Sequence, residues 1–127
     1  MPPLRVAVAG ATGYIGIQCT ALLSRHPDVE LVRLMGRSHA GSLHRDVVPG
    51  SEVELPIENT LRIDSAQVVF AALPHTVAAQ QARHWLGSGA VVIDLSADFR
   101  LRDPGAYRRW YGIEHPVPEL CEESVYA

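Results

Sequence analysis

The stretch from Val6 to Gly16, VAVAGATGYIG, constrains the fold of this chain more than any other feature of its sequence. It joins an apolar strand to a helix through a GxxGxxG turn made by Gly10, Gly13 and Gly16. In such a junction the first glycine permits a tight turn, the second lets the backbone approach a pyrophosphate, and the third lets helix and strand pack closely. Free N–H groups and the positive dipole end at the helix N-terminus favour an anion there. The stretch therefore predicts a turn that binds a dinucleotide.

Strands and helices alternate along the rest of the chain, which predicts an α/β fold with a Rossmann-type doubly wound parallel sheet, incomplete at its C-terminal end. One domain is expected over residues 1–127. Predicted strands cover residues 5–9, 29–35, 52–57, 68–73 and 90–95, a loop runs through residues 36–50, and predicted helices cover 14–25, 76–86 and a segment from Asp103-Pro104 to Gly112. The side chains expected on the buried faces of the helices are Ile15, Cys19, Leu22 and Leu23, then Ala78, Ala82, Trp85 and Leu86, then Tyr107, Trp110 and Tyr111.

The composition of the chain excludes several classes of function. Hydrophobic residues make up 47% and the formal net charge is −3, which argues against a disordered chain and against a strongly basic nucleic-acid platform. No apolar run approaches the roughly 20 residues of a membrane span. All 11 basic residues are arginines, so this chain supplies no catalytic lysine. We therefore expect a cytoplasmic domain that binds neither nucleic acid nor a membrane.

Cysteines and histidines lack the spacing of a disulfide framework or a metal site. Cys19 and Cys121 lie far apart without a CxxC motif, and Cys19 is expected as a small core side chain. The histidines expected at the surface or in loops, none with metal-ligand spacing, are His26, His39, His44, His84 and His115. No metal is therefore expected.

The end of the predicted second strand bears on the choice of dinucleotide. A domain that prefers NAD usually has Asp or Glu there, which holds the ribose 2′-hydroxyl. This chain has Gly36-Arg37-Ser38 instead. A guanidinium pairs bidentately with a 2′-phosphate, which a carboxylate would repel. The segment predicts NADP (NADPH) as the cofactor, with the alternative that Arg37 is a solvated loop residue.

Five segments together resemble one family. GATGYIG, GRSHAG, ALPH, VIDLSADFRL and YRRWYGIEH occur in this order. They resemble the N-terminal part of the N-acetyl-gamma-glutamyl-phosphate reductase family, in the semialdehyde dehydrogenase superfamily, over essentially the whole chain. The resemblance implies NADPH-dependent reduction of an acyl phosphate in arginine biosynthesis. A cysteine thiolate attacks the acyl phosphate, phosphate leaves, and hydride from NADPH reduces the thioester to an aldehyde.

The resemblance also implies roles for individual residues. The expected cofactor contacts are Gly10, Thr12, Gly13, Tyr14, Ile15 and Gly16 at the pyrophosphate, Arg37 and Ser38 at the 2′-phosphate, and Pro74 and His75 near the ribose or nicotinamide. We expect no proton transfer by His75, and Thr76 stands where the family commonly has glycine and is expected as a helix N-cap. Ser96 and Arg100 are expected to face the acyl-phosphate substrate, with the alternative that Arg100 pairs with Asp94 or Asp98. These two aspartates are expected to fix the loop.

No catalytic residue is assigned within this chain. In the family the nucleophilic cysteine lies in an Asn-Pro-Gly-Cys stretch beyond the matched region, and Cys121 lies in no such motif. The expectation is a cofactor-binding fragment that is inactive alone and exposes an unpaired strand edge, with the catalytic and dimerisation domain outside it. The full-length enzyme is expected to be a homo-oligomer.

Other readings remain open at this point. Aspartate-semialdehyde dehydrogenase shares the fold and chemistry, although the segments ADFR and WYG argue against it. A related lysine-pathway acyl-phosphate reductase would look similar. An extended short-chain dehydrogenase also has GxxGxxG but needs a Tyr-x-x-x-Lys pair. A non-enzymatic NADPH-binding module is the alternative from another class.

Overall fold

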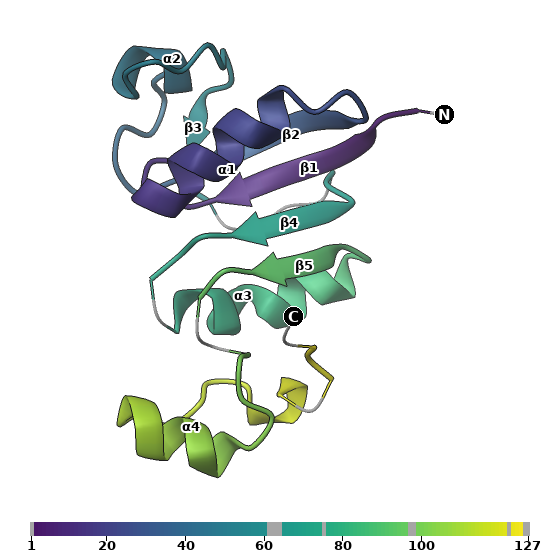
Figure 1. Cartoon of the computed structure of the whole chain (residues 1–127), viewed down its shortest axis with the longest axis vertical. Helices are drawn as coiled ribbons and strands as arrows, with labels where there is room; N and C mark the ends of the chain where they lie inside the picture. Colours follow the sequence, from purple (N-terminus) through teal and green to yellow (C-terminus); the bar gives the residue numbers. More distant parts are fainter. Residues whose placement is uncertain (1, 61–64, 75, 97–98, 122, 126–127) are drawn as a thin grey trace.

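The computed structural model describes residues 2–60, 65–74, 76–96, 99–121 and 123–125. The elements follow in the order β1 (Leu4–Ala9), α1 (Tyr14–Ser24), β2 (Val29–Met35), α2 (His44–Val47), β3 (Ile57–Glu58), β4 (Val68–Ala71), α3 (Val77–Gly87), β5 (Val91–Asp94), α4 (Pro104–Tyr111) and the 3-10 helix η1 (Pro118–Leu120). The strands form one parallel sheet in the order β3-β2-β1-β4-β5 (Figure 1). This arrangement confirms the Rossmann-type fold.

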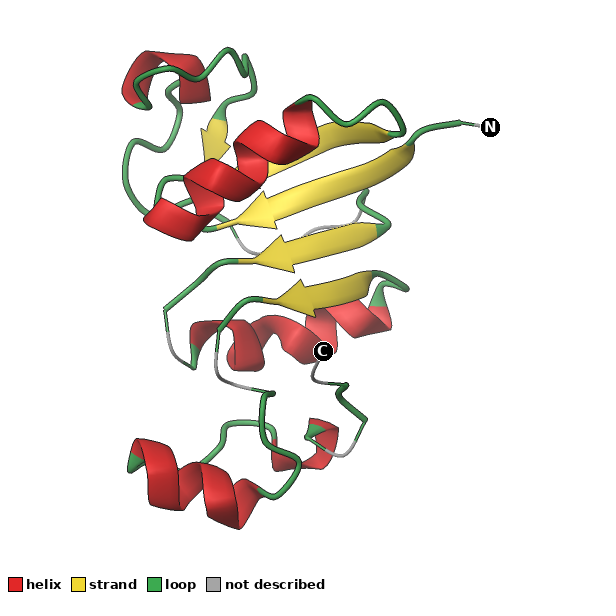
Figure 2. Ribbon diagram, viewed as in Figure 1, coloured by secondary structure: helices red, strands yellow, loops and turns green. Residues whose placement is uncertain are grey.

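The opening strand β1 lies at the centre of the sheet, between β2 and β4. Ala9 pairs with Met35 of β2 and with Ala71 of β4, so the three strands end side by side. Because all strands run in the same direction, the loops that follow them gather at one edge of the sheet (Figure 2). Ligands of open α/β sheets bind outside this carboxyl edge. In the described part of the chain β5 is the last strand on its side, in agreement with the expected open edge.

Alternate residues of the sheet contribute to two separate apolar layers. Ala7, Ala9 and Val69 pack with Trp85 of α3, which is fully buried. Val8 packs on the other face with Leu34, Cys19 and Leu23, beneath α1 (Figure 1). A parallel sheet needs cover on both faces, and apolar residues at successive positions supply it. The core is therefore two-sided, and truncation of a buried tryptophan such as Trp85 typically costs about 3–5 kcal/mol.

Helix α1 presents a different face to the sheet from the one that its apolar pattern predicts. Its buried residues are Gly16 and Thr20, whereas Ile15 and Leu22 are 56% and 71% exposed. A Cβ atom at residue 16 would overlap the carbonyl oxygen of Gly10, so the backbone of this helix rests directly on the preceding turn. This contact fixes the rotation of the helix. The expected inward positions of Ile15 and Leu22 are therefore wrong.

The segment between β2 and β4 also differs from the prediction. Its third strand is only Ile57–Glu58, not residues 52–57, and the predicted loop contains the short helix α2. The N–H groups of His44 and Arg45 donate to the carbonyl oxygens of Leu55 and Val53, which are therefore drawn to α2 rather than to β2. Pro56, which lacks an N–H group, lies at the bridge to Leu43.

The two later helices follow the predicted boundaries closely but not all of the predicted faces. The Asp103 carboxylate accepts from the N–H of Gly105 at 2.9 Å, and α4 ends at Gly112 with φ of 75°, as predicted. Thr76 is the N-cap of α3, but its φ is 72° and its side chain forms no capping hydrogen bond. Leu86 and Trp110, both expected to be buried, are 44% and 79% exposed.

A cluster of aromatic rings replaces the apolar stripe that was expected on α4. Tyr107 is buried, and its ring lies 4.6 Å from that of His115 and 4.9 Å from that of Tyr111. The Nδ1 atom of His115 accepts from the N–H of Val117 at 3.0 Å. His115 therefore lies in a loop, one of the two expected positions, but its ring is buried in this cluster and not at the surface.

We predict that the Gly16→Ala variant loses about 3 kcal/mol of unfolding free energy, because its methyl group must displace the Gly10 carbonyl. The matched control is Gly87→Ala in α3, where nothing lies within 4 Å of the added carbon. This control should gain about 0.5–1 kcal/mol, since alanine is the better helix residue. Urea unfolding measures both free energies. Equal stability of the two variants would contradict the claim that Gly16 packs tightly against the Gly10 carbonyl oxygen.

Candidate functional site

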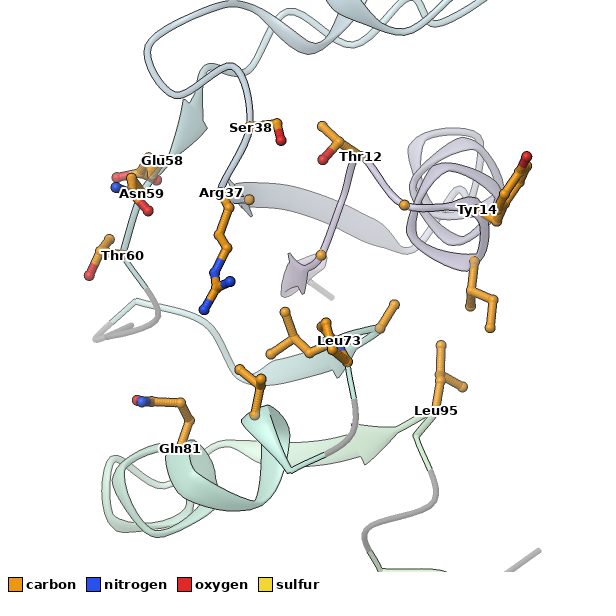
Figure 3. Close-up of a pocket in the computed structure, with 17 residues that line it drawn as sticks. Thr12, Tyr14, Arg37, Ser38, Glu58, Asn59, Thr60, Leu73, Gln81 and Leu95 are labelled. Atoms are coloured by element: carbon orange, nitrogen blue, oxygen red, sulfur yellow. The ribbon is translucent and has the colours of Figure 1, made fainter. Parts of the chain in front are cut away.

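A cavity of about 690 Å³ lies at the carboxyl edge of the sheet, over the ends of β1, β2, β3 and β4 (Figure 3). Its volume falls within the roughly 300–1,000 Å³ typical of ligand pockets. The described residues that line it are Gly10, Thr12, Gly13, Tyr14, Ile15, Gly36, Arg37, Ser38, Glu58, Asn59, Thr60, Ala72, Leu73, Pro74, Val77, Gln81 and Leu95. Eight of the predicted cofactor residues are thus brought together from three separate segments: Gly10, Thr12, Gly13, Tyr14, Ile15, Arg37, Ser38 and Pro74.

Two glycines of the turn are required by the packing of the chain itself. Gly10 has φ of 83°, and a Cβ atom there would overlap the carbonyl oxygen of Ala72, which follows β4. Gly16 lies against the carbonyl oxygen of Gly10. The N–H groups of Gly10 and Ala11 donate to the Met35 carbonyl oxygen at 2.8 and 3.0 Å. Backbone contacts therefore hold the turn between the ends of β2 and β4.

The middle glycine is not required by any such contact. Gly13 has φ of −81°, and a Cβ atom there would meet only the Gly10 carbonyl oxygen at 3.7 Å, an ordinary separation. As the N-cap of α1 it offers no side chain to the first N–H groups of the helix, which have no partners within the helix. The turn therefore presents bare backbone and a helix N-terminus to the cavity, an arrangement suited to a phosphate group.

The residues after β2 form the opposite wall of the cavity. Figure 3 shows the Arg37 side chain extending across the cavity towards α3, and the side chains of Ser38 and Thr12 directed towards one another. A Cβ atom at Gly36 would lie 3.2 Å from Thr12 Oγ1, so the two turns are in close contact. This wall is where the sequence predicts a 2′-phosphate contact.

Part of the lining was not found from the sequence. Glu58, Asn59 and Thr60 come from the end of β3, and Gln81 comes from α3. The first three directly follow the strand predicted over residues 52–57, and this position at a strand end was the available signal. Gln81 lies about one turn into α3 beside Gln80, and nothing in the sequence distinguished it from this neighbour.

Some predicted site residues lie elsewhere. Gly16 is buried under the turn and does not line the cavity. Ser96 and the exposed Arg100 are also not among the described lining residues. The Ser96 N–H and hydroxyl groups both donate to the Asp94 carboxylate at 2.9 Å, so Asp94 fixes the start of this loop as expected. His75 and Asp98, to which roles were assigned from the sequence, lie outside the described residues.

His44 contacts the glycine turn from the far side of the sheet edge. Its side chain is buried, and its Nε2–H donates to the Ala11 carbonyl oxygen at 2.9 Å. With the ring neutral, Nδ1 accepts from the Ser51 hydroxyl group at 2.7 Å, whose oxygen accepts from the N–H of Val53. The predicted surface or loop position of His44 is therefore wrong, because this ring links the segment around α2 to the turn.

Neither cysteine is placed to act at the cavity. Cys19 packs under α1, and burial raises the pKa of its thiol, which opposes formation of a thiolate. Cys121 is fully buried near η1. Among the described residues no three His, Cys, Asp or Glu side chains converge as a metal site would require. In that part of the chain no helix has the length and apolarity needed to cross a bilayer.

The sequence profile of the semialdehyde dehydrogenase NAD-binding domain matches residues 5–126. The chain belongs to this family. The reductase named N-acetyl-gamma-glutamyl-phosphate reductase from Dehalococcoides mccartyi is 44% identical over 127 residues, covering 99% of this chain and 37% of the relative. The protein of the same name from Polynucleobacter asymbioticus is 39% identical, covering 97% of this chain and 36% of the relative. The chain thus spans little more than a third of these curated relatives.

Two solved dehydrogenase structures have a similar fold. Aspartate semialdehyde dehydrogenase of Candida albicans, determined with NADP, superimposes with a TM-score of 0.65 at 21% identity, over 90% of this chain and 40% of that one. Aspartate semialdehyde dehydrogenase II of Vibrio cholerae gives 0.64 at 24% identity, over 79% of this chain and 30% of that one. These similarities show the fold of this chain.

We predict that His44→Leu lowers the unfolding free energy by about 1–3 kcal/mol, because the Ala11 carbonyl oxygen then loses its buried donor. His44→Gln, which retains an N–H donor, should recover part of this loss. His26→Leu is the control, because His26 is exposed and its ring accepts from the nearby Asp28 N–H. Denaturant unfolding of the three variants measures the contribution of the His44–Ala11 hydrogen bond to stability. A loss of unfolding free energy with His26→Leu as large as that with His44→Leu would contradict this contribution.

Proposed function

We propose that this domain binds NADP(H) as the cofactor-binding part of an N-acetyl-gamma-glutamyl-phosphate reductase, an enzyme that reduces an acyl phosphate to an aldehyde. The proposal is carried by one observation: a bare glycine turn and Arg37 face each other across one cavity. The family match and the relatives at 39–44% identity support the same assignment. Aspartate-semialdehyde dehydrogenases match this chain at only 21–24% identity, so they are the less favoured alternative.

The preference for NADP rests on the charge and position of Arg37. Its guanidinium extends into the cavity from the end of β2, where NAD-binding domains usually carry a carboxylate. A bidentate pair with a 2′-phosphate is a strong charge-assisted interaction, and Ser38 beside it adds a hydroxyl donor. Ser38 also faces Thr12, so the 2′-phosphate wall adjoins the pyrophosphate turn (Figure 3).

The chain's own residues bind and orient the cofactor in this account. Amides at the start of α1 hold the pyrophosphate, and the bare backbone at Gly13 allows its close approach. When bound, the cofactor supplies a hydride for reduction of the acyl group. In this proposal the thiol nucleophile of the reaction is neither Cys19, which is half-buried under α1, nor Cys121, which is buried, since neither is among the described lining residues of the cavity. Ser96 and Arg100 remain proposed substrate contacts, and a cytoplasmic homo-oligomer remains the proposed state of the whole enzyme.

We predict that NADPH binds more tightly than NADH and that Arg37→Asp removes this preference, weakening NADPH at least about tenfold through loss of a charge pair. Arg102→Asp is the matched control, because Arg102 is exposed and does not line the cavity. Isothermal titration of the wild type and both variants with each nucleotide gives the ratio of dissociation constants. Equal affinity of the wild type for both nucleotides would contradict the proposed preference.

We also predict that the 127-residue chain binds NADPH without oxidising it when N-acetylglutamyl phosphate is added, because Cys121 is buried and the half-buried Cys19 has a raised thiol pKa, and neither is among the described lining residues of the cavity. Loss of NADPH absorbance measures turnover. Cys19→Ser and Cys121→Ser variants should leave NADPH affinity unchanged. Turnover by the wild type that either substitution abolishes would show that a thiol of this chain is the nucleophile, against this account.

A further inference from the structure

The cavity holds one carboxylate among its described lining residues, that of Glu58 at the end of β3. Glu58 pairs in register with Met35, and its carbonyl oxygen accepts from the N–H of Gly36 at 3.0 Å. Its backbone therefore lies one residue away from the turn that carries Arg37. Glu58 and Arg37 therefore line the same part of the cavity, where a 2′-phosphate is proposed to bind.

This carboxylate is paired with an arginine outside the cavity. The Arg33 Nη1–H donates to Glu58 Oε1 at 2.7 Å, and the two side chains are 36% and 31% exposed. The Arg33 Nε–H donates to the Ser65 hydroxyl oxygen at 3.1 Å, which fixes the orientation of the guanidinium. Arg33 lies on β2 and is not among the described lining residues of the cavity, whereas its partner Glu58 is.

The state of this pair decides what the wall of the cavity recognises. An unpaired carboxylate beside the adenosine ribose repels a 2′-phosphate and accepts hydrogen bonds from ribose hydroxyls, which favours NAD. A carboxylate already bonded to an arginine exerts little net field and has fewer free lone pairs. The same Glu58 can therefore oppose or tolerate a phosphorylated ribose, depending on Arg33.

We propose that Arg33 is a specificity-determining residue, which neutralises Glu58 and so lets the cavity accept the 2′-phosphate of NADP. It does this without contact with the nucleotide, and is a positioning residue in that sense. The inference rests on the proposed function, because it concerns the choice between two dinucleotides at that site. Arg37 attracts the 2′-phosphate, and pairing with Arg33 reduces the repulsion between the Glu58 carboxylate and this phosphate.

The test measures NADPH and NADH dissociation constants for Arg33→Met, Glu58→Gln and the double variant. Arg33→Met should weaken NADPH about tenfold with NADH unchanged or tighter, and the loss should shrink in high salt. The double variant should prefer NADPH over NADH at least as strongly as the wild type does, because no carboxylate remains at residue 58. Arg45→Met is the matched control, because it also breaks an arginine–glutamate pair, with Glu54, away from the cavity.

Glu58→Gln alone keeps the test decisive if Arg33→Met does not fold. It leaves the Arg33 charge without its counter-ion, so it should raise the preference for NADPH, whereas a purely structural pair predicts no change in the ratio. Equal weakening of both nucleotides by Arg33→Met, or an unchanged ratio in every variant that folds, overturns the inference while the proposed function stands. A wild type that binds neither nucleotide overturns both.

Discussion

The contact between the backbone of Gly16 and the carbonyl oxygen of Gly10 is the constraint on which the site depends. It seats the first turn of α1 on the end of β1, so the unpaired N–H groups of the helix open directly above the sheet edge. The same contact sets the rotation of α1 and leaves Ile15 exposed at the rim of the cavity. One backbone contact thus determines both the packing of the helix and the phosphate-binding character of the turn.

The parallel sheet brings together side chains that lie far apart in the chain. Residues after β1, β2, β3 and β4 meet at one edge because their strands end side by side. Three charged residues lie near this edge: Arg33, its partner Glu58, and Arg37, which lines the cavity together with Glu58. Arg33 pairs with Glu58, whereas the Arg37 side chain extends into the cavity (Figure 3). The electrostatics of the site therefore follow from strand order as well as from residue type.

Local patterns in the sequence predicted the strand–turn–helix unit, the sheet class and the cap of α4 at Asp103, because each depends on residues close together in the chain. The buried faces of α1 and α4 were predicted less well. Backbone contact at Gly16 overrides the apolar period, and the ring cluster around Tyr107 leaves Trp110 outside. Interactions between segments distant in the chain left no local signal in the sequence. Examples are the hydrogen bond from His44 to Ala11 and the backbone bonds of Leu55 and Val53 to α2, which shorten β3.

The central claim is that backbone amides at the start of α1 hold the pyrophosphate of a dinucleotide. Hydrogen–deuterium exchange of individual amides, compared with and without NADPH, tests it most directly. The account predicts that the strongest new protection falls on the N–H groups of Tyr14 and Ile15, with weaker protection around Ser38. Saturation with NADPH that leaves exchange at these two amides unchanged, with protection confined to another face, would contradict it.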